Sequence, residues 1–214
     1  MVNAEGRTWA ERLTKALERE FVAVSAADFD PETEADLIVY SCAARSRSVQ
    51  HLLNVSRELR CPYIILTPAM HYPAEGVLNS VLAPVTMLEE EVHKAELLSH
   101  LARYTGTAIT LLTAHDYGSR AQTNTGKIHT FLCSRQEDLG MTFHIDRQTA
   151  KSDSMSLYKE VPAIRSVDAV VWTASRDYGL DDIIFGPAER KIILHSVVPI
   201  ILLNPRGDLY SLCD

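Results

Sequence analysis

The sequence predicts a doubly wound α/β fold, with a five-stranded, mostly parallel sheet and a partial N-terminal repeat of the same unit. Two observations predict the sheet: short, nearly continuous apolar runs alternate with longer segments of helical periodicity, and turn residues separate them. Helical connections join parallel strands by right-handed crossovers, and strands without a polar side are buried on both faces. The sheet is therefore expected to carry helices on both faces.

The full unit is expected to span residues 79–214. Its five predicted strands are, in order, Ser80–Val85, Ala108–Ala114, Met141–Ile145, Asp168–Thr173 and Val197–Leu203. Its four predicted helices run from Leu88 to Ala102, from Lys127 to Glu137, from Ser152 or Asp153 to about Ile164, and from about Pro187 to Ser196. Gly106 is expected to close the first helix, and a polar loop with Asn124 and Gly126 to precede the second.

Residues 1–78 are expected to form the partial repeat. Ala35–Ala43 aligns with Val167–Ser175, and Cys61–Pro68 aligns with Val198–Pro205, in the same order and at nearly constant spacing. Paired self-similarity of this kind indicates an internal duplication. The alternative is a chance match, because buried strands share apolar composition.

The partial repeat has no counterpart of the first strand, helix and strand of the full unit. It is expected to begin with a helix from about Arg7 to Glu20 and a short strand at Phe21–Ser25. Either a turn around Pro31 replaces a helix before the next strand, or the two strands are not parallel neighbours. Met70–Leu78 is the expected linker to the full unit.

Composition and motifs exclude several function classes. The 214 residues carry a net charge of −7 and no basic block, so no nucleic-acid partner is expected. The longest apolar run has seven residues, far short of the roughly 20 that span a bilayer, so no membrane span is expected. Four scattered cysteines fit a cytoplasmic protein. No CxxC or HExxH motif occurs, and no nucleophile and base lie at motif spacing, so neither metal-ligating nor catalytic residues are predicted.

The nine glycines exclude three kinds of phosphate or nucleophile loop. No two of them are closer than seven residues. Dinucleotide-binding, Walker and nucleophile-elbow motifs all need glycines five or fewer residues apart. None of the three motifs is therefore present.

Several segments together resemble the universal stress protein family over nearly all of residues 79–214. The segments are, in order, Val81–Val85 before a Glu-rich helix, Leu101–Gly106 running into Ala108–Leu112, Val167–Val171, Phe185–Ile192 and Val198–Leu203. The first unit resembles the back half of the same domain. The whole chain is thus similar to a tandem universal stress protein whose first copy lacks the opening strand, helix and strand.

The resemblance also indicates where ATP would bind. Members that bind ATP use an Asp after the first strand and a Gly-x2-Gly-x9-Gly-Ser/Thr stretch after the fourth. Thr86 occupies the Asp position, Thr173 and Arg176 the first two Gly positions, and Gly186 and Pro187 the Gly-Ser/Thr. Side chains at the first two positions hinder close approach of phosphate to the backbone, and proline has neither the hydroxyl nor the N–H. The phosphate cradle is expected to be degenerate.

The resemblance implies a non-catalytic, stress-response binding or scaffold protein without conventional ATP binding. Two alternatives stay open. One is an ATP- or AMP-binding protein with weak ATPase activity, which uses Arg176 and the helix start at Gly186. The other is a regulatory domain of a cation/proton antiporter. Arg45 and Arg47, in the matching loop of the first unit, are further candidate phosphate contacts.

The resemblance also implies how the two repeats would associate. Universal stress proteins dimerise through their fifth strand. In a tandem chain, Pro62–Thr67 would then pair with Pro199–Leu203 inside one molecule and cover the exposed strand edge. The result would be an intramolecular pseudo-dimer, and a homodimer of the whole chain remains open.

Overall fold

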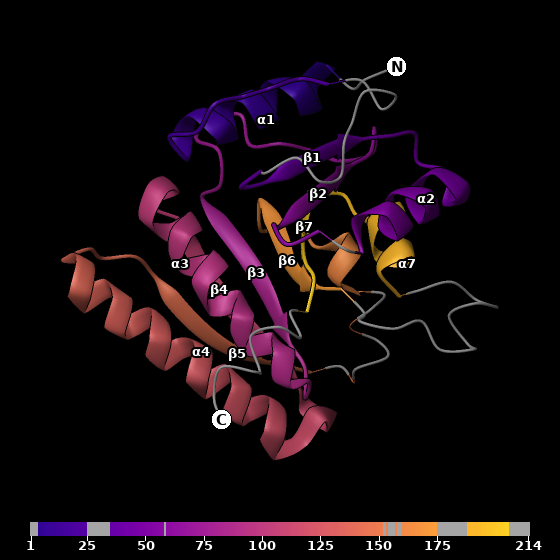
Figure 1. The fold of residues 1–214 in the computed structure, drawn as a ribbon. Coiled ribbons are helices and arrows are strands. Elements are labelled where there is room, and N and C mark those ends of the chain that lie inside the picture. The colour runs from indigo at the N-terminus through magenta and orange to yellow at the C-terminus, as the bar shows by residue number, and fades with distance from the viewer. Residues whose placement is uncertain are drawn as a thin grey trace.

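Seven strands form one sheet in the part of the chain that the computed structural model describes, namely residues 4–24, 35–57, 59–151, 153, 157, 160–174 and 188–205. The strands are β1 (Ile38–Ser41), β2 (Tyr63–Leu66), β3 (Ser80–Val85), β4 (Ala108–Ala114), β5 (Ile145–Ala150), β6 (Ala169–Thr173) and β7 (Ile200–Leu203). They lie in the order β1-β2-β7-β6-β3-β4-β5 (Figure 1).

The described helices lie between these strands or before them. The α-helices are α1 (Ala4–Ala16), α2 (Ser46–Ser56), α3 (Lys94–Thr105), α4 (Gly118–Leu139) and α7 (Ala188–His195). Three short 3-10 helices are η1 (Glu89–His93), η2 (His115–Tyr117) and η3 (Val161–Ala163). Within the described ranges, no helix is both long and apolar enough to cross a membrane.

The sheet is parallel with one exception, which confirms the predicted α/β class. Only β2 and β7 run antiparallel, with Ile64 opposite Ile201. β3 has β4 on one side and β6 on the other, so the chain winds outward from it in both directions. The junction of β3 and β6 is the topological switch point of a doubly wound sheet, and ligands of such folds bind outside the carboxyl ends of the strands there.

One hydrophobic core extends through both segments that the sequence assigned to separate repeats. β2, β6 and β7 are buried along their whole length. The core cluster runs from Trp9 in α1 to Leu202 in β7. The boundary near residue 78 remains a prediction, because β1 and β2 extend the same sheet as the other five strands.

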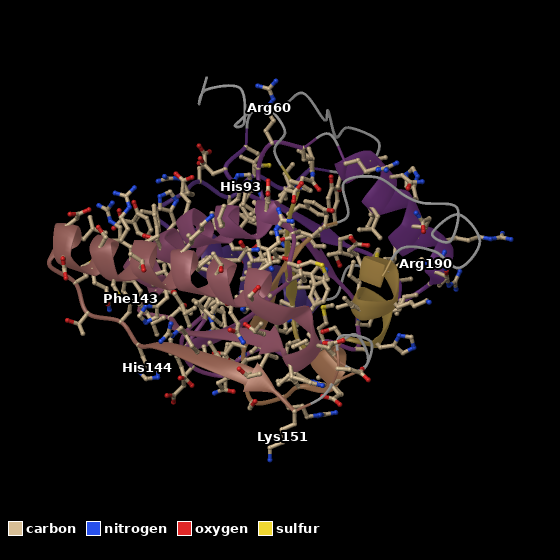
Figure 2. All side chains as sticks on the ribbon, turned by 90° about the horizontal axis from the view of Figure 1, so that it is seen from below. Arg60, His93, Phe143, His144, Lys151 and Arg190 are labelled. Atoms are coloured by element: carbon tan, nitrogen blue, oxygen red, sulfur yellow. The ribbon has the colours of Figure 1, made fainter. Side chains whose placement is uncertain are left out.

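The helices form two groups, one towards each end of the strand order. In Figure 1, α3 and α4 lie together over β3, β4 and β5, whereas α2 and α7 lie side by side near β2 and β7. Figure 2 shows Arg190 of α7 and His144, the residue before β5, at opposite ends of the molecule, with His93 of η1 between them. The switch point therefore lies between the two groups of helices.

α1 packs on the segment that the sequence predicts as a linker. The Trp9 indole N–H donates to the Val77 carbonyl oxygen at 3.0 Å, and the rings of Trp9 and Tyr72 lie 5.5 Å apart. Trp9 and Leu13 are both fully buried. The packing of α1 thus holds the linker against the core.

The third strand of the full unit lies later than predicted. The sequence predicts Met141–Ile145, but the strand is β5, Ile145–Ala150. Because β5 is an edge strand, its middle residues face solvent and are polar, so it has no apolar run to mark it.

The second helix of the full unit also begins earlier than predicted, at Gly118 instead of Lys127. The expected polar loop is part of α4, because its polar side chains find partners inside the protein. Asn124 donates to two carbonyl oxygens, and the Thr125 hydroxyl lies 2.8 Å from that of Thr113. Buried polar groups that are satisfied in this way are compatible with a helix.

Other element boundaries differ at the ends of helices. η1 precedes α3, which begins at Lys94, and Gly106 closes α3 with a left-handed φ of 69° as predicted. Residues 21–24 form no strand, and Ser25 lies outside the described residues. Residues 152, 154–156, 158 and 159 of the third predicted helix, Ser152–Ile164, also lie outside them.

Candidate functional site

The carboxyl ends of β3 and β6 bring two of the predicted site residues together. Thr86 directly follows β3, and Thr173 is the last residue of β6. Both hydroxyls donate to the carboxylate of Glu91, Thr86 to Oε1 at 2.7 Å and Thr173 to Oε2 at 3.2 Å. The two threonines therefore bind a side chain of the protein itself at the switch point.

Lys94 completes this group as the cation. Its Nζ lies 2.5 Å from Glu91 Oε2 and also donates to the carbonyl oxygen of Pro84. The Glu91 side chain is 2% exposed and the Lys94 side chain 1% exposed. We call Thr86, Glu91, Lys94 and Thr173 the switch-point cluster.

Local structure explains why the acid and the base face each other. Glu91 lies in η1 and Lys94 begins α3, three residues further on, so the two side chains share one face of the helical segment. Glu91, Lys94, Leu98 and Leu101 are all buried at that spacing. The face that carries the ion pair is therefore the face that packs on the sheet.

The loop that carries Thr86 is held by the neighbouring helix. Asn124 of α4 donates from its amide nitrogen to the carbonyl oxygens of Thr86, at 3.0 Å, and of Leu88, at 2.8 Å. The Leu88 N–H donates to the Thr86 hydroxyl oxygen at 3.3 Å, so that hydroxyl keeps its proton for Glu91. These bonds position the loop without any contribution from the Glu91 side chain.

Burial decides the electrostatics of the cluster. Loss of solvation lowers the pKa of Lys94, while the charge of Glu91 and the hydrogen bond to it act in the opposite direction. Two charges removed from water need a close counter-charge and further hydrogen bonds. The two threonine hydroxyls and the Pro84 carbonyl supply those bonds.

As a result, every donor that surrounds the Glu91 carboxylate already has an acceptor within the protein. Lys94 and the hydroxyl protons of Thr86 and Thr173 are all engaged by Glu91 or by backbone oxygen. An anionic ligand at this place would meet a buried negative charge. It would also have to displace the tethered carboxylate to reach the donors.

An open groove of about 560 Å³ lies beside the cluster, between η1 and α4. Its lining residues are Glu89, Val92, Ser119, Arg120, Thr123, Asn124 and Lys127. The Arg120 guanidinium is paired with the exposed carboxylate of Glu89 across it. The groove is thus bordered by an exposed ion pair, in contrast to the buried pair in the cluster.

The other predicted site residues are not part of this geometry. Arg176, Gly186 and Pro187 lie outside the described residues. Arg45 and Arg47 are exposed at the start of α2, and no side chain caps that helix. Their assignment as phosphate contacts stays a prediction.

Sequence reasoning missed Glu91 and Lys94. In the resemblance, this segment counted only as a Glu-rich helix after Val81–Val85. The signal that could have found the pair is their place on the apolar stripe of α3, because charged residues at that spacing from Leu98 and Leu101 are expected to be buried.

Comparison with known proteins gives a structural likeness only. No family model matches the chain, and no curated protein matches it. A universal stress protein from Archaeoglobus fulgidus DSM 4304 superposes with a TM-score of 0.57 at 14% identity, over 81% of this chain and 62% of that one. The chain thus spans less than two thirds of that relative.

Two further solved structures are similar at lower scores. One is a universal stress protein in complex with cAMP, with a TM-score of 0.47 at 11% identity, over 62% of this chain and 100% of that one. The other is a putative universal stress protein from Pseudomonas aeruginosa UCBPP-PA14, with a TM-score of 0.43 at 15% identity, over 83% of this chain and 66% of that one. Together with the strand order and the switch point, the Archaeoglobus likeness shows that this chain has the fold of the universal stress proteins.

Proposed function

We propose that this chain is a universal stress protein homologue that acts as a non-catalytic, stress-response binding or scaffold protein in the cytoplasm, without conventional ATP binding. The observation that carries the proposal is the occupation of the switch point by Glu91. At the place where a doubly wound fold offers its ligand site, the protein presents a carboxylate with its donors already engaged.

Energetics support the absence of nucleotide binding. A phosphate group would lie against the Glu91 carboxylate, and like charges in a dry site repel strongly. Moving Glu91 aside would leave Lys94 buried without its counter-ion, at a cost of several kcal/mol. A nucleotide would have to recover that cost before any net affinity appeared.

The scaffold part of the proposal is supported by the antiparallel contact of β2 with β7. These are the segments that the resemblance predicts to pair between repeats. The contact is reinforced by Asn204, whose amide donates to the carbonyl oxygens of Ser56 at 2.6 Å and Leu59 at 3.0 Å. We interpret the chain as an intramolecular pseudo-dimer in which each segment covers the strand edge of the other.

Isothermal titration calorimetry tests the binding part. ATP, ADP, AMP and cAMP are each titrated into the full chain with and without Mg²⁺, and no saturable heat is expected at micromolar concentrations. A micromolar, magnesium-dependent affinity for ATP would overturn the proposal. It would favour the alternative in which Arg176 and Gly186 form a remodelled phosphate loop.

A further inference from the structure

We propose that Thr86, Thr173 and Lys94 form a small-anion site whose tethered occupant is Glu91, so that a free carboxylate ion binds there once the Glu91 side chain is removed. The inference rests on the proposed function in one respect, namely that Glu91 fills the switch point. It adds that the donors around Glu91 are a binding site in their own right, for a ligand of the size and charge of acetate.

The geometry of the donors supports this assignment. Three donors from three elements converge on one carboxylate: the loop after β3 supplies Thr86, the end of β6 supplies Thr173, and the start of α3 supplies Lys94. One oxygen of Glu91 accepts from Thr86, and the other accepts from Thr173 and Lys94. Charge-assisted bonds from several directions are how proteins hold carboxylate ligands.

The donors keep their places independently of the Glu91 side chain. Thr86 is fixed by its bond from Leu88 and by Asn124, and Thr173 lies in β6, paired with Leu203 of β7. Lys94 is held by the Pro84 carbonyl oxygen. Shortening Glu91 therefore leaves an arranged set of donors, with little reorganisation required before an anion binds.

The substitution Glu91→Ala creates a space of matching shape. It removes one methylene carbon and the carboxylate group, which together have the same heavy atoms as acetate. Lys94 and Thr173 are buried and Thr86 is half-buried, so the space is expected to persist as a cavity lined by polar donors. Formate fits the same space, whereas butyrate is too long.

In the native chain, the Glu91 carboxylate is covalently attached beside its own site, and this attachment prevents free acetate from replacing it. A group attached to its own site acts at an effective concentration of millimolar or more, and the Glu91 carboxylate is already ordered by η1. Free acetate at similar concentrations therefore gains nothing by replacing it. Only the variant is expected to bind acetate.

Thermal unfolding of Glu91→Ala tests the inference, with 0–100 mM sodium acetate compared with sodium chloride and with acetamide at the same concentrations. We expect a Kd of about 5 mM, in the range available to a ligand of four heavy atoms, and hence a saturable rise in Tm of roughly 4–7 °C at 100 mM acetate. Acetamide, which has the shape of acetate without its charge, should have no effect. Binding is measured independently by NMR of ¹³C-labelled acetate.

Two controls separate site binding from general salt effects. Glu89→Ala removes an exposed carboxylate from the same turn, and neither it nor the native chain should respond to acetate beyond the chloride response. The double variant Glu91→Ala/Lys94→Met keeps the cavity without the cation, and its acetate affinity should fall at least tenfold.

Each outcome decides for or against the inference. If Glu91→Ala responds to acetate as it does to chloride, the anion site does not exist, although the proposed lack of ATP binding would stand. If Glu91→Ala is unfolded, refolding in acetate but not in acetamide supports the site, and failure in both overturns it. ATP binding by the native chain would instead contradict the proposed function.

Discussion

The buried ion pair of Glu91 and Lys94 gives the most direct test of the switch-point cluster. Lys94→Met removes the cation and leaves Glu91 in a site where it is 2% exposed. Removing one partner of a buried pair costs about 3–5 kcal/mol, because the other charge stays desolvated and unpaired. For a chain of this size that loss corresponds to a fall in Tm of roughly 6–20 °C.

The double variant Glu91→Gln/Lys94→Met should recover a large part of this loss. It has no buried charge, and the glutamine oxygen can still accept from a threonine hydroxyl. The free energy of unfolding, from urea titrations followed by circular dichroism, should show a coupling of at least about 2 kcal/mol between the two sites.

A second ion pair, which joins the same 3-10 helix to α4, serves as the matched control. Glu89 and Arg120 form a pair whose side chains are 65% and 61% exposed. Arg120→Met should therefore change stability by less than about 1 kcal/mol. If Lys94→Met cost no more than Arg120→Met, or if the cycle at Glu91 and Lys94 were additive, the pair would not hold the switch point together and our account of the site would be wrong.

Three further predictions concern contacts elsewhere in the fold. Tyr72→Phe should leave stability at pH 7 unchanged or slightly raised, because the buried Tyr72 hydroxyl has no hydrogen-bond partner among the described residues. Burial raises the pKa of Tyr72 from 10.0 to about 12, so the folded chain disfavours the tyrosinate, and ionisation of Tyr72 lowers the free energy of unfolding only as the pH rises from about 10 to 12. Urea titrations should show a smaller alkaline loss in Tyr72→Phe than in the native chain, and equal losses would contradict this. Asn204→Asp should cost about 1–3 kcal/mol in the same assay, since it removes the amide donors to Ser56 and Leu59, whereas Asn54→Asp, at an exposed position that accepts a bond from Gln50, should cost little. A fragment of residues 79–214 exposes the edge of β7 and should self-associate in light scattering; a stable monomer would argue against the pseudo-dimer.

The parts of the fold that were predicted correctly are those in which burial dictates composition. β3, β4, β6 and β7 are surrounded by other elements, and their apolar runs marked them in the sequence. β5 borders solvent and its residues are largely polar, so no apolar run indicated this strand in the sequence. The start of α4 was missed for a related reason: Asn124 and Thr125 are polar residues that the fold buries and satisfies, and sequence alone does not show where their partners lie.

The sequence did not reveal the buried ion pair of the candidate site. The resemblance assigned Thr86 and Thr173 to positions of the ATP motif, an assignment that stays a prediction, and the strand order brings these two residues together at the switch point. Their common partner could not be predicted from charge alone, because exposed acidic clusters at helix starts are common and buried ones are rare. Only the packing of α3 shows which of three consecutive glutamates points inward.

The cluster also shows how the protein itself fills the switch point of this fold. A polar cavity at the end of a parallel sheet must be filled by water, by a ligand or by the protein, because unpaired buried donors are costly. Here Glu91 fills it, and Lys94 balances the charge that Glu91 brings. Both residues come from the single helical segment of η1 and α3, so the residues that fill the site are separate from those that form the β2–β7 contact. Under the proposed function, the same pair of charges accounts for an absence of ATP binding in a chain that keeps the strand order of the fold.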